Sequence, residues 1–309
     1  MTLQQLHYVV ALDNYRHFVK AAESCFVAQP TLTLQVKKLE DEIGLVIFDR
    51  SSKPLTPTYQ GEKFILKARQ IIREVEGLKE MVNDDRQSLT GICKIGIIPT
   101  LSPYLIPLFL KSFSDAHPDL QLEISEMQSD DILAELDNGK LDIGMLVVPT
   151  QQRNIREVKL FSEPFLYYAN EEDSLLQQSR LSTEDIDEKG LWLLGQGHCF
   201  RDQVLNICNR LDKNSEENRI KFKTGSLETL KKMILSHSGY TLLPELAVSS
   251  NDKKNVKKFE SPQPARQIGL AVHKSFTKEL LLKNLRDAIL EVVPNHFHKT
   301  KEFITVKWR

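Results

Sequence analysis

The hydrophobic pattern of the chain changes once, at about residue 90. Before this point the apolar residues recur at helical spacing, and from Ile92 onward short alternating apolar runs take turns with helical segments. The chain has 309 residues, which is long enough for more than one hydrophobic core. The sequence therefore predicts a helical N-terminal part followed by an α/β part.

Three short helices are predicted within residues 1–57. Pro30 suits the first turn of a helix, where its missing N–H is tolerated, and Leu32, Val36 and Leu39 follow it at helical spacing. Residues 25–28 form a turn before this helix, so the second and third helices have helix-turn-helix proportions. The apolar positions of the first two helices are Leu3, Leu6, Val9 and Val10, then Phe18, Ala21 and Ala22.

A long helix is predicted after the break at Pro54 and Pro57, with Thr58 as its cap. Its apolar residues alternate between spacings of four and three, which is typical of a coiled-coil seam. The same stripe could instead pack on its own domain, but the break at Thr90 and Gly91 favours a linker that dimerises. The seam positions are Phe64, Ala68, Ile71, Val75, Leu78 and Val82.

The second part of the chain alternates strands with helices, which predicts an α/β architecture. Strands that return late in the sequence predict two subdomains with a crevice between them, a common place for ligands in such folds. The predicted strands cover residues 92–98, 120–124, 143–148, 165–169, 191–194, 240–243 and 268–272. The predicted helices cover residues 105–113, 132–136, a segment from about 226, and 278–292.

Composition excludes several classes of protein. No apolar run approaches the roughly 18 residues of a membrane helix, and the N-terminus is not a secretion signal, so we expect a cytoplasmic protein without membrane contact. The 41 basic and 42 acidic residues give no bulk attraction for nucleic acid, and any DNA contact must come from local placement. Zinc-ligand spacing, a phosphate-binding glycine loop and a Ser-His-Asp order are not found. We therefore expect no metal, no cofactor and no enzyme activity.

Cysteine usage points to regulation. Four cysteines are too few to staple a secreted fold, so a disulfide here should be a regulated one. Cys25, in the second predicted helix, and Cys93, in a predicted strand, are expected to be small buried hydrophobes. Cys199 and Cys208 lie nine positions apart. Cys199 taken alone would also be expected to be buried and inert.

The sequence resembles the LysR-type transcriptional regulators. The matching residues are Ala21-Ala22-Glu23, Gln29-Pro30-Thr31-Leu32-Thr33, Lys38-Leu39-Glu40, Gly44, Phe48-Asp49-Arg50 and Thr58 to Gly61. Ala28 departs from the pattern, which often has serine there, and alanine is a weak cap. The resemblance covers the whole chain, and it implies a bacterial, nucleoid-associated regulator of transcription that binds promoter DNA as a homotetramer, a dimer of dimers.

This resemblance implies a domain plan. A winged helix-turn-helix is expected over residues 1–57, a linker and dimerisation helix over 58–89, and a periplasmic-binding-protein-like regulatory domain over 90–309. Within the latter, subdomain I is expected at about 90–162 and 267–309, and subdomain II at about 163–266. The third helix would place its first residues in the major groove. Base-edge contacts are expected from Gln29, Pro30, Thr31 and Thr33, and phosphate contacts from Lys38, Arg50 and Lys53.

Within the family, the closest likeness is to its peroxide-sensing members. It is carried by Gly197-His198-Cys199-Phe200-Arg201-Asp202-Gln203, then Cys208, then Ser226-Leu227-Glu228-Thr229-Leu230. What it implies is a peroxidatic Cys199 and a resolving Cys208, with hydrogen peroxide as the signal. Antioxidant genes would be activated, with RNA polymerase and a cytoplasmic dithiol reductant as partners. The residues implied around the peroxide are Thr100, Ser129, His198, Asp202 and Arg266, with Ser129 standing where threonine is usual.

The chemistry requires that Cys199 be a thiolate, because the thiolate is the form that attacks peroxide. His198, Arg201 and the N-terminal end of a helix beginning near Phe200 are expected to favour the anion. On one continuous helix, Cys199 and Cys208 would be about 13 Å apart along the axis. A disulfide needs Cα atoms within about 7 Å, so its formation would have to unwind this helix.

Three other functions remain open at this point. A LysR-type regulator could bind a small organic effector in its crevice, with the cysteines incidental. A thiol peroxidase would use Cys199 for catalysis and turn over many times with a reductant. A purely structural interaction protein would show no sequence-specific DNA binding.

Overall fold

The computed structural model describes residues 1–83, 89–186, 190–195, 197, 199–208, 224–299 and 302–308. The chain divides into two compact units. The first comprises Met1–Gln87 with Ser275–Glu279, and the second comprises Ser88–Lys274 with Leu280–Arg309. The predicted boundaries at residues 57, 89, 162 and 266 remain predictions.

The first unit contains four helices and a small hairpin among its described residues. The elements are α1 (Leu3–Tyr15), α2 (Phe18–Ser24), α3 (Gln29–Ile43), β1 (Phe48–Asp49), β2 (Thr56–Pro57) and α4 (Tyr59–Asn83). The three predicted short helices and the long helix are confirmed. Thr58 accepts a hydrogen bond from the Gly61 N–H at 2.9 Å, which confirms it as the cap of α4.

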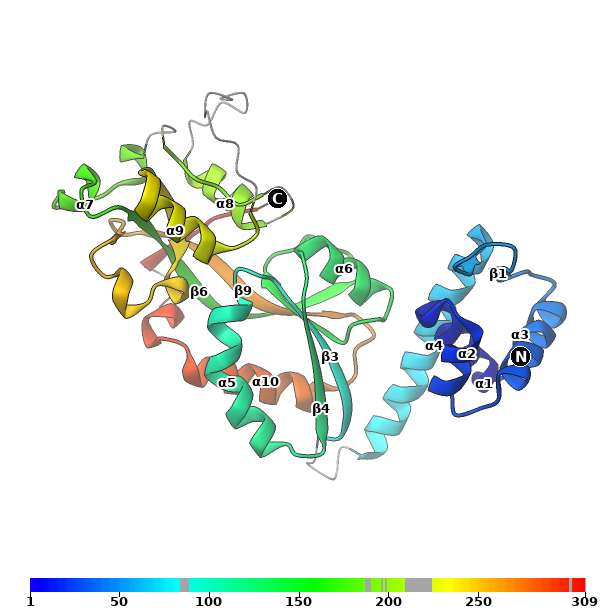
Figure 1. Ribbon diagram of the computed structural model, residues 1–309. Helices are drawn as coiled ribbons and strands as arrows, with labels where there is room; N and C mark the ends of the chain where they lie inside the picture. Colours follow the sequence, from blue (N-terminus) through cyan, green and yellow to red (C-terminus); the bar gives the residue numbers. More distant parts are fainter. Residues whose placement is uncertain are drawn as a thin grey trace. The chain divides into compact units, whose positions relative to one another are not determined.

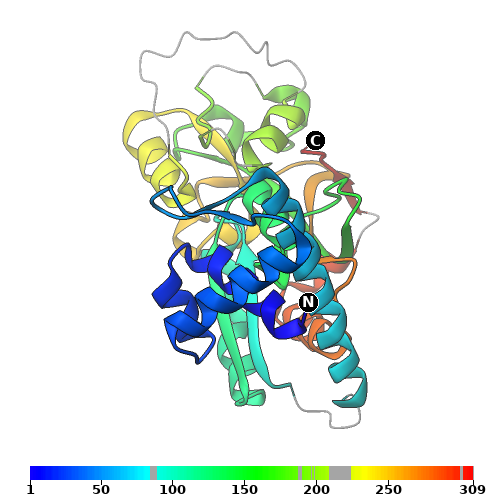
Figure 2. The same cartoon turned by 90° about the vertical axis from the view of Figure 1, so that its right-hand side faces the viewer.

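The core of this unit lies between α1, α2, α3 and one face of α4, whose length carries it beyond the short helices in Figures 1 and 2. Leu32, Val36 and Leu39 of α3 are fully buried, as their spacing predicts. Burying a side chain of this size contributes about 1.5–3 kcal/mol. α3 begins without a side-chain cap at Ala28, in agreement with the weak capping expected of alanine. Cys25 follows α2 instead of lying inside it, and it is half-buried.

An ion-pair cluster joins α1 to α4. Arg69 of α4 donates to the Asp13 carboxylate at 2.7 Å, and Arg16 donates to the other Asp13 oxygen at 2.6 Å. Asp13 and Arg69 are both buried, so the removal of Asp13 would leave the Arg69 charge in the core without a carboxylate partner among the ion pairs of this cluster. The cluster therefore holds the start of the long helix against the helix-turn-helix.

The second unit is built on a mixed sheet. Its strands are β3 (Gly91–Ile97), β4 (Leu120–Glu126), β5 (Ile143–Val147), β6 (Ile155–Ala169), β7 (Tyr240–Pro244), β8 (Val256–Lys258), β9 (Gln263–His273) and β10 (Phe303–Thr305). Among the described residues the order is β4-β3-β5-β9-β6-β7, with β10 beside β9 and β8 beside β6. The strands β3, β4 and β5 are parallel, whereas β9 runs antiparallel to β5 and β6. Cys93 is fully buried in β3, as predicted.

Helices cover both parts of this sheet. They are α5 (Ser102–Ala116), α6 (Ser129–Asp137), α7 (Ser174–Gln177), α8 (Cys199–Ile207), α9 (Leu227–His237) and α10 (Glu279–Val292). In Figure 1, α5 and α6 lie with β3 and β4, while α8 and α9 lie at the other end of β6. Ser226 caps α9 by accepting from the Thr229 N–H at 3.3 Å. The predicted strand at 191–194 is wrong: only an isolated bridge joins Leu191 to Tyr240.

Two long strands pass between the two parts of the second unit. β6 pairs with β9 over its first ten residues and with β7 over its last five. The change of partner occurs between Pro164 and Phe165, next to the cross-strand pair Glu163 and Arg266. The sequence analysis predicted only residues 165–169 of β6 and residues 268–272 of β9. Polar residues interrupt the apolar pattern in the remaining parts of both strands. The pair stands where the two parts of the sheet meet.

Candidate functional site

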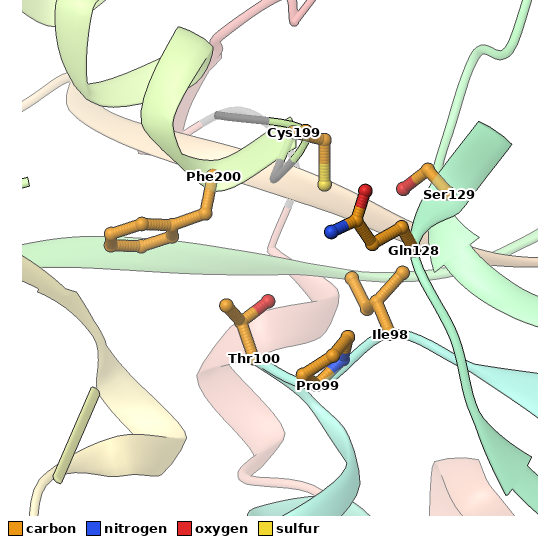
Figure 3. Close-up of a pocket in the computed structure, with 8 residues that line it drawn as sticks. Ile98, Pro99, Thr100, Gln128, Ser129, Cys199 and Phe200 are labelled. Atoms are coloured by element: carbon orange, nitrogen blue, oxygen red, sulfur yellow. The ribbon is translucent and has the colours of Figure 1, made fainter. Parts of the chain in front are cut away.

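Cys199 lines a small cavity in the second unit. The other lining residues come from the end of β3, the start of α6 and the start of α8: Ile98, Pro99, Thr100, Gln128, Ser129, Gly197 and Phe200. Figure 3 shows the Cys199 sulfur pointing toward the Gln128 amide and the Ser129 hydroxyl, with Thr100 on the far side. The space open to the centre of a water-sized molecule is about 10 Å³. This is about the minimum that holds a single water molecule.

The position of Cys199 follows from the packing of α8. The helix begins at Cys199 itself, and Phe200, Val204 and Ile207 are buried in the core on one side of it. The Phe200 ring lies 5.7 Å from the ring of Phe165 in β6, and in Figure 3 it points away from the Cys199 sulfur. Anchoring Phe200 in the core therefore turns the first residue of the helix toward the cavity. The predicted helix start near Phe200 is confirmed.

Thr100 is held by a buried arginine. Arg266 donates to the Thr100 hydroxyl at 2.9 Å and to the Thr100 carbonyl at 3.0 Å. Because the hydroxyl oxygen accepts from Arg266, its own proton is free to point into the cavity. Arg266 pairs in turn with Glu163 at 2.8 Å, and Glu163 also accepts from the Leu246 N–H at 2.9 Å. Both charged side chains are fully buried.

Ser129 presents a hydroxyl to the same cavity from the first residue of α6. It is buried, and its oxygen has no hydrogen-bond partner of normal length among the described residues. Figure 3 shows this oxygen directed toward Cys199. A buried hydroxyl with no partner other than the nearby Cys199 sulfur can still bind a polar molecule, so its place beside the small cavity suits a polar ligand.

Burial dominates the ionisation of Cys199. It raises the pKa of the Cys199 thiol, while the Ser129 hydroxyl, the Arg266 charge and the Phe200 N–H act in the opposite direction. The sequence analysis expected surroundings that favour the thiolate. Among the described residues burial acts against the thiolate, and the contribution expected of His198 remains a prediction. Desolvation of the anion outweighs the neighbouring donors because the side chain is only 4% exposed.

Cys208 lies just beyond the C-terminal end of α8. Its N–H donates to the Val204 carbonyl at 3.2 Å, so the helical hydrogen-bond pattern runs from Cys199 to Cys208 without a break. None of the four cysteines, all of which are described, forms a disulfide. The two Cα atoms are consequently about 13 Å apart along the helix axis, as the sequence analysis predicted.

The C-terminal segment is attached to α8 by two side chains. Gln203 donates to the Val306 carbonyl at 3.0 Å, and Asn206 donates to the Lys307 carbonyl at 2.8 Å. Just before these residues, β10 pairs with β9, and the Val306 N–H donates to the Ala265 carbonyl at 2.8 Å. A change in the path of α8 would therefore break the two side-chain contacts from Gln203 and Asn206 to residues 306–307.

The structure brings together some of the predicted site residues and not others. Thr100, Ser129 and Cys199 line the cavity, and Arg266 lies directly behind Thr100. The Asp202 side chain is exposed and does not line it, although its charge acts to raise the pKa of Cys199. His198 lies outside the described residues. Its predicted role and that of Asp202 remain predictions.

Glu163 and Gln128 were missed from the sequence. Glu163 could have been noticed, because it is a single carboxylate within the apolar strand residues 160–169, where an unpaired charge would be costly. Gln128 gave no such signal. It precedes a predicted helix, where a polar residue is ordinary, and only its position beside Gly197 reveals its place in the site.

Comparison with known proteins identifies the class of regulator. Residues 86–294 match the family described as "LysR substrate binding domain". Residues 3–62 match "Bacterial regulatory helix-turn-helix protein, lysR family". The chain belongs to the LysR family. Its fold is accordingly an N-terminal helix-turn-helix followed by a periplasmic-binding-protein-like regulatory domain.

Similar LysR-family proteins include several OxyR proteins. The DNA-binding transcriptional dual regulator OxyR of Escherichia coli is 36% identical over 302 residues, covering 97% of this chain and 98% of that one. The hydrogen peroxide-inducible genes activator of Haemophilus influenzae is 37% identical over 273 residues, covering 87% and 90%. A cysteine-to-aspartate variant of full-length OxyR from Pseudomonas aeruginosa superposes with a TM-score of 0.82 at 33% identity, covering 94% of each chain.

The helix predicted to contact DNA is α3, which follows α2 in the helix-turn-helix. Gln29, Pro30, Thr31 and Lys38 are exposed, whereas Thr33 is half-buried and its hydroxyl donates to the Gln29 carbonyl at 3.0 Å. Phe26, in the turn before α3, was missed by the sequence analysis. It is 96% exposed and has a φ of 56°, which is unusual for a bulky residue.

The wing of this LysR-family unit is tied to α3 by Glu40. Its carboxylate accepts from the N–H groups of Ile47 and Phe48 at 2.8 and 3.2 Å, and from Arg50 at 2.7 Å. Arg50 also stands over the ring of Phe18. Arg50 is thus already engaged in holding β1 against α3, while Lys53 is exposed in the loop between β1 and β2.

The predicted seam of α4 is partly turned toward its own unit. Ala68 is buried in that core, together with Ile65 and Ile72, so the assignment of Ala68 to a surface seam needs correction. Ile71 and Leu78 are exposed and Phe64 and Val75 are half-buried, while the Val82 side chain lies outside the described part. Pairing through α4 remains a prediction.

The part of the chain that the structure describes lacks two further features. No helix there is long and apolar enough to cross a membrane. No group of three or more His, Cys, Asp or Glu side chains is placed to hold a metal ion.

Proposed function

We propose that this protein is a peroxide-sensing transcription regulator whose sensor is Cys199. The observation that carries the proposal is the small cavity that Cys199 lines together with two residues that bear a hydroxyl group, Thr100 and Ser129. The Thr100 hydroxyl oxygen accepts from Arg266, so its proton can be donated to a ligand in the cavity. The Ser129 hydroxyl has no other described partner. Hydrogen peroxide, with two oxygens that both donate and accept, suits this arrangement.

The first chemical step is oxidation of the Cys199 thiolate. The sulfur attacks one peroxide oxygen, the O–O bond breaks, and the other oxygen leaves as hydroxide and takes up a proton to become water. Cysteine becomes sulfenic acid, and the peroxide is reduced. The Arg266 charge and the Thr100 hydroxyl stabilise the negative charge that develops on the leaving oxygen. His198 and Asp202 belong to the proposed surroundings by resemblance alone.

The second step is attack by Cys208. Its thiolate bonds to the Cys199 sulfur, the S–O bond of the sulfenic acid breaks, and the hydroxide that leaves takes up a proton to become water, which yields a disulfide. Because α8 separates the two cysteines by about 13 Å along its axis, the helix must unwind before their Cα atoms come within about 7 Å. The disulfide and the folded α8 exclude each other, and this gives the regulatory domain two states.

The change in α8 would be read out at DNA. A dimer that pairs through α4 presents two recognition helices to two half-sites, and a dimer of dimers spans a longer site. Gln29, Pro30, Thr31 and Thr33 are the proposed base-edge contacts, and Lys38, Arg50 and Lys53 the proposed phosphate contacts. Refolding of the regulatory domain would alter how these heads meet the promoter and RNA polymerase. A cytoplasmic dithiol would return the protein to its reduced state.

The size of the cavity favours a small signal molecule over an organic effector at Cys199. Pockets for such ligands are usually about 300–1,000 Å³. The Cys199 cavity is far smaller, at about 10 Å³. A solved relative also supports peroxide as the ligand, since a cysteine-to-serine variant of OxyR from Corynebacterium glutamicum was solved with hydrogen peroxide bound. It superposes with a TM-score of 0.63 at 26% identity, covering 94% of this chain and 92% of that one.

The deciding experiment is thiol mapping of the full-length protein by mass spectrometry, before and after one equivalent of hydrogen peroxide. We expect a new disulfide between Cys199 and Cys208 that a dithiol reverses, with Cys25 and Cys93 unchanged. Unmodified Cys199, or oxidation confined to Cys25 and Cys93, would refute the proposal and favour an organic effector. Repeated turnover of peroxide without any change in DNA binding would favour a thiol peroxidase.

A further inference from the structure

We infer that Gln128 is the gate of the Cys199 cavity and the residue that restricts oxidation to the smallest peroxides. This inference rests on the proposed peroxide-sensing function and adds a selectivity device to it. Among the described lining residues, only Gln128 and Gly197 are exposed, so these two stand between the cavity and solvent. The residues behind them, including Ile98, Thr100 and Ser129, are buried.

Gln128 and Gly197 close against each other. A methyl group placed on Gly197 would overlap the Gln128 side-chain amide, with the amide carbon only 3.0 Å away. Gly197 also has a φ of 91°, a conformation that residues with a side chain rarely adopt. Glycine at this position therefore leaves the space that the amide fills. In Figure 3 the amide lies over the cavity and points toward the Cys199 sulfur.

The Gln128 side chain is not used for another structural task that the described residues reveal. It occupies the N-cap position of α6, yet it makes no side-chain capping hydrogen bond. The neighbouring Asp130 and Asp131 already place acidic groups in the first turn of this helix. The amide is thus free of helix capping and extends across the mouth of the cavity instead.

The Gln128 side chain would select among peroxides by steric exclusion. The space beneath the amide admits about one water-sized molecule, and hydrogen peroxide has only two heavy atoms. An alkyl hydroperoxide must bring its carbon substituent through the same mouth, where it would collide with the Gln128 side chain. Shortening that side chain should open the mouth while leaving Thr100, Arg266 and Ser129 in place.

The test compares two peroxides on the full-length protein carrying Cys208→Ser, so that oxidation stops at the sulfenic acid of Cys199. The rate constants for hydrogen peroxide and cumene hydroperoxide are measured by trapping the sulfenic acid with dimedone and quantifying the Cys199 peptide. Gln128→Ala is compared with Gln128→Leu, which keeps the bulk but removes the amide. Gln121→Ala, an exposed glutamine of β4 outside the cavity, is the matched control.

We expect Gln128→Ala to lower the preference for hydrogen peroxide over cumene hydroperoxide by about tenfold or more, the scale at which a pocket discriminates by small differences in bulk. Gln128→Leu and Gln121→Ala should keep the original preference. An unchanged preference in Gln128→Ala, or an equal loss in Gln128→Ala and Gln128→Leu, would overturn the gate. Failure of hydrogen peroxide to oxidise Cys199 in the parent protein would instead refute the proposed function.

Discussion

The Arg266 guanidinium donates two hydrogen bonds to Thr100, one to its hydroxyl at 2.9 Å and one to its carbonyl at 3.0 Å. The two residues are 166 positions apart in the sequence. Arg266 lies on β9 opposite Glu163 of β6, so the strand pair that joins the two parts of the regulatory domain also holds Thr100 in the lining of the Cys199 cavity. The ion pair of Arg266 with Glu163 and the position of Thr100 in the cavity therefore depend on the same guanidinium.

Arg266→Met should separate the structural and chemical roles of this residue. Its loss leaves Glu163 as a buried carboxylate without a cation, which we expect to lower the free energy of unfolding by about 3–5 kcal/mol in denaturant titrations. Adding Glu163→Gln removes the unpaired charge and should restore most of the stability. The rate of Cys199 oxidation by hydrogen peroxide should stay low in the double variant, because Thr100 is still unsupported. Full recovery of the rate would show that Arg266 acts on stability alone.

The pH dependence of Cys199 oxidation follows from its buried thiol. Burial raises the pKa of the Cys199 thiol above its usual range, so the thiolate fraction, and with it the rate, should rise about tenfold per pH unit up to that pKa. We expect the rate to keep rising through neutral pH in stopped-flow measurements. Ser129→Ala removes a group that lowers the pKa and should slow the reaction throughout this range, whereas Ser129→Thr keeps the hydroxyl and should retain the rate. A plateau near pH 7 would contradict the expected direction.

Oxidation should release the C-terminal segment from α8. Gln203 and Asn206 can hold residues 306–307 only while the helix is folded. Hydrogen exchange at Val306 and Trp308 should therefore increase after peroxide treatment in the parent protein and stay unchanged in Cys208→Ser, which cannot form the disulfide. Asn206→Ala should increase the exchange in the reduced protein. Equal protection in the reduced and oxidised proteins would mean that α8 keeps its path.

The two basic residues of the wing should behave differently. Lys53→Ala is expected to weaken binding to all DNA sequences and to reduce the slope of log K against log salt by about 1, without a change in melting temperature. Arg50→Ala should also lower the melting temperature, because Glu40 loses the cation that lies against its carboxylate. Salt titrations by fluorescence anisotropy and thermal melts on the same samples distinguish the two. A sequence-dependent effect of Lys53→Ala would indicate a base contact.

Local patterns in the sequence determined most of the elements of this protein. The spacing of Leu32, Val36 and Leu39 predicted the buried face of α3, and Thr58 predicted the start of α4, because helical periodicity and capping depend only on residues a few positions apart. The nine-residue spacing of Cys199 and Cys208 likewise placed the two cysteines far apart on one helix, since helical rise is a local property.

Only the tertiary structure decided how the site is assembled. Thr100, Ser129 and Cys199 come from three separate segments, and the pair of Glu163 and Arg266 depends on the register of two long strands. Burial outweighs the donors around Cys199, and Ala68 faces its own core instead of a seam. These outcomes depend on which distant surfaces exclude water from a side chain. The residues next to a side chain in the sequence do not show whether water is excluded from it, because desolvation is a property of the packed molecule.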